Sequence, residues 1–306
     1  MHHQDIDQLA KAWIVDAAER PANPRVQAIV LRLVADLCKA MEDLDIQPSE
    51  FWKGVEFLTN AGKNNELGLL TPGLGLERFM DIRADEAEAR AGIEGGTPRT
   101  IEGPLYVAGA PQSQGFARLD DGSESERAEV LFMQGTVFDA DGMPLPGATV
   151  EVWHANLVGN YSFFDATQSH FNLRRTIVTD AQGRYRFQSI MPKGYGCPPG
   201  GSTATLLDQL GRHGQRPAHI HFFVSAPGQR KLTTQINIDG DEYLWDDFAF
   251  ASREGLVPPV RRVDDPASIA ASGQDKPFAS IDFDFHLHRE VQAAPSAHVE
   301  RQRAAA

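Results

Sequence analysis

The sequence is poor in cysteine, in basic charge and in long apolar runs. Of its 306 residues only Cys38 and Cys197 are cysteines, so it can build neither a disulfide framework nor a cysteine zinc cluster. Asp and Glu outnumber Lys and Arg by 42 to 29, and a formal net charge of -13 repels a nucleic-acid backbone. No apolar run is long enough to span a bilayer, and residues 1–7 lack the pattern of a signal peptide. We therefore expect a cytoplasmic protein that binds neither nucleic acid nor membrane.

The first hundred residues have the apolar spacing of amphipathic helices. We predict a helix from about Ile6 to Pro21, one over 24–44 that is capped by Asn23, a third over 48–62, and a fourth over 74–90. The second helix has a dense apolar stripe, consisting of Val26, Ile29, Val30, Leu33, Val34, Leu37, Met41 and Leu44. Helices this short need a surface to pack on, which could be another helix, the second half of the chain or a second copy of the chain. The density of the stripe favours a subunit interface. We expect the charged residues near the end of the fourth helix to be solvated.

Glycine and proline mark a boundary near residue 100, beyond which apolar and polar residues alternate with period two. This alternation predicts strands over 130–138, 148–153, 175–178, 184–187, 219–224, 233–238 and 280–286. Short strands at near-regular spacing, with helices confined to the N-terminal side, indicate an α+β protein. We expect an N-terminal helical domain (1–100), an antiparallel β-sandwich domain (101–289) and a flexible tail (290–306).

A histidine pair stands out within residues 216–222, RPAHIHF. In a strand, His219 and His221 point to the same side, while the apolar residues that follow each of them face the core. Two imidazoles on one face can hold a metal ion. However, His286 and His288 have the same spacing, so spacing alone does not choose between the pairs.

Two of the five tyrosines lie in glycine-containing turns. Tyr161 is in the run GNYS (159–162), and Tyr195 is in the run KGYGCPPGG (193–201). Glycine lets the backbone bend so that a phenol can be presented inward from a loop. Taken singly, each tyrosine could equally be a packing residue with its hydroxyl at the surface.

Taken together, these motifs resemble the ligand signature of the intradiol ring-cleaving dioxygenases. In chain order the signature consists of Asn156, residues 159–162, residues 193–195 and residues 216–222. The intervals of 34 residues from Tyr161 to Tyr195 and 24 from Tyr195 to His219 are similar to those of that family. Residues 96–111 (GTPRTIEGPLYVAGAP) and 115–118 resemble its catechol 1,2-dioxygenase branch. The resemblance therefore covers nearly the whole chain.

The resemblance implies a metal centre and a set of catalytic residues. The implied ligands of one non-haem Fe(III) per chain are Tyr161, Tyr195, His219 and His221, and His286 and His288 are then structural. Fe(III) is hard and favours anionic oxygen donors, and two tyrosinates with one hydroxide balance its charge. The resemblance also makes Tyr195 the tyrosinate that departs and acts as a base. Arg216 and Gln235 then stabilise the negative charge that develops on the substrate ring.

The implied reaction is intradiol cleavage of catechol with O2 to cis,cis-muconate, as in the β-ketoadipate pathway of aromatic catabolism. Positions that line the pocket in the catechol branch are occupied here by Leu69, Pro72, Ile101 and Ala249, together with Arg216. This small apolar set favours catechol or a lightly substituted catechol, while chlorocatechol and hydroxyquinol remain alternatives. The resemblance also implies a homodimer formed through the N-terminal helices, which can hold lipid.

Two other classes of protein are compatible with parts of the sequence. One is a metal-free, transthyretin-like β-sandwich that acts only as a binding module. The other is a zinc or Fe(II) enzyme in which the histidines are joined by a carboxylate such as Asp241. Neither class accounts for two tyrosines in glycine-containing turns.

Overall fold

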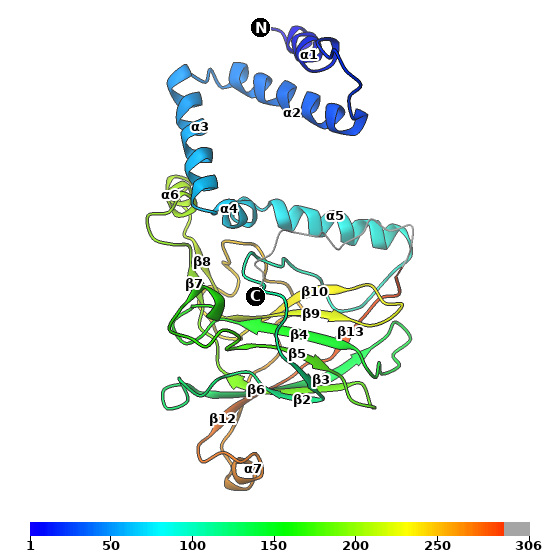
Figure 1. Ribbon diagram of the computed structural model, residues 1–306, viewed down its shortest axis with the longest axis vertical. Coiled ribbons are helices and arrows are strands. Elements are labelled where there is room, and N and C mark those ends of the chain that lie inside the picture. The colour runs from blue at the N-terminus through cyan, green and yellow to red at the C-terminus, as the bar shows by residue number, and fades with distance from the viewer. Residues whose placement is uncertain (291–306) are drawn as a thin grey trace. The chain divides into compact units, whose positions relative to one another are not determined.

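The computed structural model describes residues 1–290, so the predicted tail lies, apart from its first residue, outside the described residues. The chain divides into two compact units, residues 1–64 and a second unit that begins at Asn65. As predicted, the fold is mixed, with a helical region at the N-terminus and β-sheets after it (Figure 1). Among the described helices, none has the length and apolar character needed to cross a bilayer.

The first unit is helical. Its elements are α1 (His3–Lys11), a π-helical turn (Ala12–Asp16), α2 (Pro24–Asp43) and α3 (Pro48–Lys63). The predicted cap of α2 is confirmed, because the side chain of Asn23 accepts hydrogen bonds from the amides of Arg25 (3.0 Å) and Val26 (3.2 Å). An ion pair of 2.6 Å between Lys39 and Asp7 links α2 to α1.

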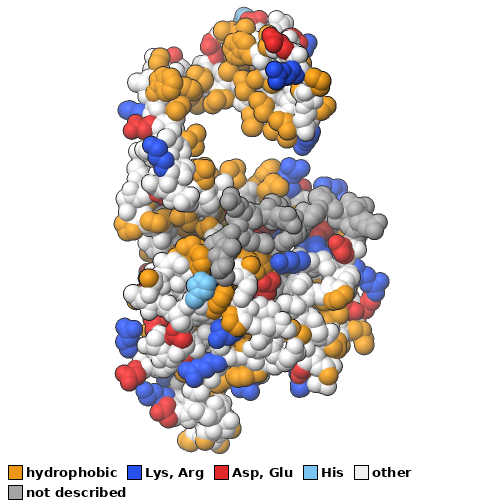
Figure 2. All heavy atoms as spheres, in the orientation of Figure 1, with side chains coloured by type: hydrophobic (Ala, Val, Ile, Leu, Met, Phe, Trp, Pro, Cys, Tyr) orange, Lys and Arg blue, Asp and Glu red, His pale blue; other side chains and the backbone are white. Residues whose placement is uncertain are grey.

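The apolar stripe of α2 is largely exposed. Leu33 is 63% exposed and Leu37 is 54% exposed, while Ala35 is the buried residue of this helix. Figure 2 shows hydrophobic side chains gathered on the N-terminal helices. An apolar surface of this kind is typical of an interaction site.

The second unit contains two large β-sheets. The five-stranded sheet has the order β1 (Gln112–Gln114), β5 (Arg174–Val178), β4 (Thr149–His154), β9 (His219–Ser225) and β10 (Leu232–Asn237). The six-stranded sheet has the order β11 (Arg261–Val263), β12 (Phe278–Asp282), β3 (Val130–Phe138), β6 (Arg184–Ile190) and β2 (Phe116–Arg118), and β13 (Phe285–His286) also pairs with β3. The prediction of a purely antiparallel arrangement is wrong, because β1–β5, β2–β6, β12–β3 and β13–β3 are parallel. Strands joined by long connections are free to pair in either direction, which local alternation does not reveal.

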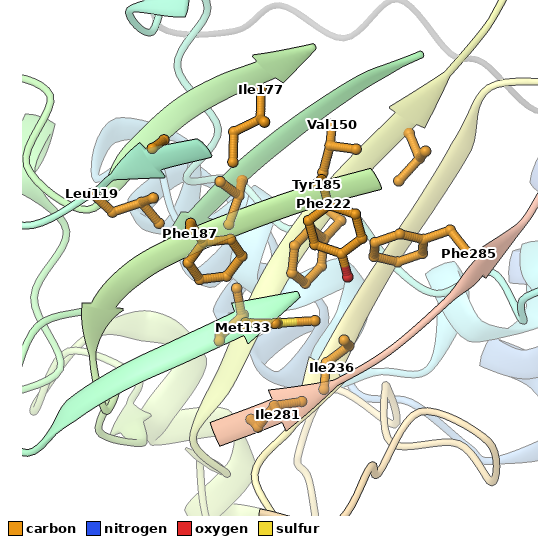
Figure 3. Close-up of a cluster of buried hydrophobic side chains, with 14 of the residues drawn as sticks. Leu119, Met133, Val150, Ile177, Tyr185, Phe187, Phe222, Ile236, Ile281 and Phe285 are labelled. Carbon is orange, nitrogen blue, oxygen red and sulfur yellow. The ribbon is translucent and has the colours of Figure 1, made fainter. Parts of the chain in front are cut away.

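The two sheets share one buried hydrophobic cluster. Phe222 and Ile236 enter it from the five-stranded sheet, and Met133 and Phe187 enter it from the six-stranded sheet. Figure 3 shows these side chains pointing toward one another. Ile220 is also in the cluster, as the alternation along β9 predicted. The histidines of β9 therefore lie on the opposite face of the sheet.

The second unit also contains helices that the sequence analysis did not predict. They are α4 (Leu67–Gly73), α6 (Ser202–Gln209) and α7 (Pro266–Ala271), while the predicted fourth helix corresponds to α5 (Leu76–Arg90). Helices are therefore not confined to the N-terminal side. With 7, 8 and 6 residues, these three helices are too short to show a clear helical period in the sequence.

The charged end of α5 is not simply solvated, which corrects the prediction. Asp85 forms ion pairs with Arg99 (2.8 Å) and Arg253 (2.9 Å). Glu88, which is only 9% exposed, pairs with Arg99 and with Arg230 (3.1 Å). The arginines come from distant parts of the chain, so a local charge pattern could not reveal that they cover this end of the helix.

Candidate metal centre

The histidine pair lies on β9, which is flanked in the sheet by β4 and β10. His219 and His221 are 2% and 1% exposed, and their Nε2 atoms are 3.0 Å apart. The Nδ1 atom of His219 lies 2.6 Å from the carbonyl oxygen of Pro217, so Nδ1 carries the proton and Nε2 presents its lone pair toward the site. The His221 ring stacks on Trp153, with 5.0 Å between centroids and 5° between planes.

Burial keeps both imidazoles neutral. It lowers the pKa of His219 to about 3, with a further contribution from the positive charge of Arg216. Burial also lowers the pKa of His221 well below its ordinary value, with His219 adding to the effect. Neutral imidazole is the form that binds metals.

Tyr195 reaches the histidines from a short two-stranded sheet. It lies on β7 (Tyr195–Gly196), which pairs with β8 (Gln215–Arg216) so that Tyr195 stands opposite Arg216. The Tyr195 hydroxyl is 3.4 Å from Nε2 of His219. A Cβ atom on Gly194 would lie 2.5 Å from the backbone oxygen of Arg216, so the close approach of these strands requires glycine.

Tyr161 enters the site from the loop after β4. The Asn156 side chain accepts hydrogen bonds from two backbone amides of this loop and so fixes its path. Gly159 has φ +84°, and a Cβ atom there would lie 2.7 Å from the Cβ of Tyr195. Glycine thus lets the loop bring the Tyr161 hydroxyl within 3.5 Å of the Tyr195 hydroxyl, with Tyr161 only 3% exposed.

Two phenol oxygens and two imidazole nitrogens therefore converge, with neighbouring donors separated by 3.0–3.5 Å. Ligands at right angles on a metal, with bonds of about 2 Å, lie about 3 Å apart. Burial raises the pKa of Tyr161 well above its ordinary value, and the neighbouring Tyr195 raises it further, so the phenol needs a nearby cation to ionise. Within residues 1–290, no three His, Cys, Asp or Glu side chains gather to hold a metal. The donor set fits a hard cation such as Fe(III).

Arg216 and Gln235 lie beside the four donors. Arg216 is 4% exposed, with Nη1 3.1 Å from Nε2 of His219, and it donates to Oε1 of Gln235 at 2.8 Å. It also forms a two-pronged ion pair with Asp247, at 3.2 and 3.1 Å. Burial opposes ionisation of Asp247, but Arg216 outweighs it and holds the pKa of that carboxyl below its ordinary value. The sequence analysis missed Asp247. The apolar run Phe248–Ala251 that follows this carboxylate was a usable signal of burial, and a buried carboxylate needs a charged partner.

One row across the five-stranded sheet carries four side chains on the face that holds the donors. Its members, in neighbouring register, are Arg174 on β5, Trp153 on β4, His221 on β9 and Gln235 on β10. Residues paired in this way project to the same face of a sheet. The sequence analysis named His221 and Gln235 but missed Trp153 and Arg174. Their place in the row depends on the strand order β5-β4-β9-β10, which the sequence does not show.

The predicted pocket residues fall into two groups. Ile101 and Ala249 are buried in one hydrophobic cluster, which also includes a residue of α6. The Ala249 amide donates to Asp247 at 3.0 Å, which connects this cluster to Arg216 through the carboxylate. Leu69 and Pro72 lie on α4, which packs against α6. The structure thus brings Ile101 and Ala249 together and places the other two on a helix that adjoins their cluster.

The alternative ligands lie elsewhere. His286 is exposed on β13 and stacks on Phe138, whereas His288 faces Gly96, where a Cβ atom would lie 2.5 Å from its Nε2. The carboxylate of Asp241 accepts hydrogen bonds from two backbone amides, both at 2.9 Å. Asp241 therefore already serves to shape the backbone.

Comparisons with known proteins agree with this geometry. The family model described as "Dioxygenase" matches residues 101–289, and "Catechol dioxygenase N terminus" matches residues 23–92. The chain is 59% identical over 295 residues to catechol 1,2-dioxygenase of Acinetobacter guillouiae, which covers 96% of this chain and 97% of that protein. It is 64% identical over 264 residues to catechol 1,2-dioxygenase 2 of Acinetobacter lwoffii, covering 86% and 95%.

A solved structure extends the agreement to the fold. The crystal structure of wild-type Acinetobacter radioresistens catechol 1,2-dioxygenase superposes with a TM-score of 0.97 at 63% identity, covering 100% of this chain and 99% of that chain. Identity and structural likeness of this extent run through both units of the chain. The protein therefore belongs to the family of intradiol ring-cleaving dioxygenases.

Proposed function

We propose that this protein cleaves catechol with O2 between the two hydroxyl-bearing carbons, which gives cis,cis-muconate. The observation that carries the proposal is the convergence of two buried phenols and two neutral imidazoles at spacings of 3.0–3.5 Å. One non-haem Fe(III) per chain would be held by Tyr161, Tyr195, His219 and His221. Similarity to catechol 1,2-dioxygenases over nearly the whole chain supports the substrate.

Bound Fe(III) would withdraw electron density from a chelated catecholate and so open its ring to attack by O2. The protein supplies the proton transfers and the charge stabilisation. Tyr195, on a short strand between glycines, takes a proton from catechol and moves away, while Tyr161 stays in place. Arg216 lies against His219 and Tyr195, where its charge stabilises negative charge on the substrate ring. Asp247 and Gln235 hold the guanidinium in that position.

The apolar wall favours catechol or a lightly substituted catechol. Ile101 and Ala249 offer no polar atom to a third hydroxyl, and burying that hydroxyl without a partner costs about 1–3 kcal/mol. Leu69 and Pro72 extend the apolar lining in this proposal. A hydroxyquinol would therefore be a poorer substrate. A chlorocatechol is the second candidate, because the same apolar residues can contact a chlorine.

We also propose that residues 101–289 form a β-sandwich catalytic domain and that helices within residues 1–100 mediate dimerisation in a cytoplasmic enzyme. The hydrophobic cluster shared by the two sheets supports the first part. The exposed stripe on α2, with Leu33 63% exposed, supports the second, and lipid can occupy part of that surface. Sedimentation should show a dimer that Leu33→Glu dissociates. A wild-type monomer would contradict the dimer.

A visible spectrum tests the proposed metal centre. The iron-loaded protein should be red, because charge transfer from tyrosinate to Fe(III) absorbs visible light, and adding catechol in air should consume O2 and yield cis,cis-muconate. A colourless iron-loaded protein would refute the proposal, and a yellow semialdehyde product would indicate cleavage outside the two hydroxyls. Activity that depends on zinc, or on Fe(II) with an added reductant, would favour the histidine and carboxylate alternative. A colourless protein that binds catechol without O2 uptake would favour the binding module.

A further inference from the structure

A second arginine near the metal centre has no acidic partner among residues 1–290. Arg174, at the start of β5, is 1% exposed, and neither of its terminal nitrogens has a hydrogen-bond partner within residues 1–290. Its Nε atom donates to the Ser162 hydroxyl at 3.2 Å. None of the ion pairs in this part of the chain includes Arg174, whereas Arg216 is paired with Asp247. A guanidinium stays charged at neutral pH, so this is a buried and uncompensated positive charge.

The group that faces this charge is the ring of Tyr161. The guanidinium carbon of Arg174 lies 5.6 Å from the centroid of that ring. Ser162, which Arg174 contacts, is the residue next to Tyr161 in the chain. In the proposed metal centre Tyr161 is a tyrosinate, and its negative charge would be the missing counter-charge for Arg174.

The two tyrosines therefore have unlike electrostatic surroundings. Tyr195 stands opposite Arg216, whose charge is already neutralised by Asp247. Tyr161 stands against Arg174, whose charge has no acidic partner within residues 1–290, and the charge of Arg216 also reaches Tyr161. A nearby uncompensated cation stabilises a phenolate, so Arg174 offsets part of the cost that burial places on negative charge at Tyr161.

We propose that Arg174 is a positioning residue that supplies the counter-charge for Tyr161 and so stabilises it as the tyrosinate ligand that stays bound. This inference rests on the proposed function, because it assigns a cause to the retention of one of its proposed ligands. The inference predicts that the charge of Arg174 has opposite effects on the stability of the metal-free protein and on the binding of iron. The uncompensated charge destabilises the metal-free fold, and in the iron-loaded protein it stabilises the ligand.

The test compares iron-loaded wild-type protein with Arg174→Met and Arg174→Gln, both of which remove the charge. Arg174→Lys keeps the charge, and Ser162→Ala removes only the hydrogen bond. A matched control is Arg175→Met, because Arg175 is the next residue of β5 and points to the other face of the sheet. Visible spectra, iron affinity by competition with a chelator, and urea unfolding of the metal-free proteins are measured for all of them.

The visible band of Arg174→Met should move to longer wavelength, because removing the cation raises the energy of the electrons that Tyr161 donates. Iron affinity should fall about 10–100-fold, as is typical when a group that supports a metal ligand is removed. Arg174→Gln should behave in the same way, while Arg174→Lys, Ser162→Ala and Arg175→Met should keep a band close to that of the wild type. The metal-free Arg174→Met protein should resist urea at least as well as the wild type.

Two results would overturn the inference. One is that both charge-removing variants fold and bind iron with an unchanged band and affinity, while the wild type is red and active. The other is that metal-free Arg174→Met and Arg174→Gln lose as much stability as Ser162→Ala, which would make the role structural. If the wild type itself is colourless and inactive with iron, the proposed function fails and the inference loses its ground with it. Wild-type colour and activity thus separate the two failures.

Discussion

Two histidine pairs with the same spacing have very different surroundings in this molecule. His219 and His221 are both buried, with their Nε2 atoms 3.0 Å apart and a tyrosine hydroxyl 3.4 Å from one of them. His286 is exposed and stacks on Phe138, and His288 packs beside Gly96. The spacing is therefore only a condition for a metal site. What distinguishes the first pair is the set of groups that the fold brings to it.

The position of each strand in its sheet explains the difference. β9 has seven residues and lies between β4 and β10, so both neighbours can contribute side chains to the face of His221. Those side chains are Trp153 and Gln235. β13 has two residues and pairs with β3 alone, so the face of His286 receives far fewer partners.

Removing one histidine from each pair tests most directly which pair binds the metal. His221→Ala should lose bound iron and catechol-dependent O2 uptake by more than about 100-fold, because even a residue that only supports a metal ligand is worth roughly 10–100-fold. His288→Ala should keep both per folded molecule. Iron content and O2 uptake of the soluble fractions measure the difference. Equal losses in the two variants would contradict the assignment of the metal to the first pair.

A smaller loss is expected from removing the Tyr161 hydroxyl, one of the two phenol oxygens proposed as donors beside the first pair. Tyr161→Phe should weaken the visible colour and the activity together, because the hydroxyl is the atom that would bind iron. Tyr185→Phe is the matched control, since the Tyr185 hydroxyl is also buried but donates to the backbone oxygen of Phe283 at 2.8 Å. The control should lose about 1 kcal/mol of stability and keep its colour. Unchanged turnover in Tyr161→Phe would refute that ligand.

The sequence predicted the parts of this site that depend on local pattern and motif. Alternation along 219–224 predicted which side chains of β9 enter the core, and Ile220 and Phe222 do so. The glycine turns and motif spacing named all four converging donors, but only through resemblance to a family, since neither histidine spacing nor a single tyrosine was decisive.

The remaining parts of the site depend on contacts between distant segments. Asp247 meets Arg216 across 31 positions of the chain, and Trp153 meets His221 only because β4 and β9 are neighbours. The burial of Glu88 by Arg99 and Arg230 likewise requires the folded chain. A local sequence pattern contains no information on which strands become neighbours, so these residues were missed or misjudged.

Arg216 contacts the first pair directly, with Nη1 3.1 Å from Nε2 of His219, and its buried ion pair with Asp247 holds it there. Asp247→Asn should lower kcat/KM for catechol about 10–100-fold, since Arg216 would lose its counter-charge and its fixed orientation. Iron content should stay near that of the wild type. Asp246→Asn is the control, because the Asp246 side chain is 81% exposed and pairs with His213 at 3.0 Å, away from Arg216. Steady-state kinetics would contradict the proposal if the two variants behaved alike.

The smallest effect concerns His288, which is buried without being a proposed ligand. Burial lowers its pKa below the ordinary value, and the charge of Arg230 lowers it further. The unfolded chain therefore binds a proton more readily than the folded chain. The stability due to neutral His288 is present above its unfolded pKa of about 6.5 and is lost as the pH falls toward the folded pKa.

Replacing His288 should remove that acid sensitivity. Between pH 7.5 and 5, metal-free His288→Gln should lose less stability in urea unfolding than the wild type, whereas His286→Gln should lose as much as the wild type because its side chain is exposed. His219 and His221 are unchanged in all three proteins, so whatever they contribute to the acid sensitivity cancels when the losses of the three proteins are compared. If His288→Gln were as acid-sensitive as the wild type, burial of His288 would not affect its protonation. The two histidine pairs would then differ only in the metal donors that surround the first pair.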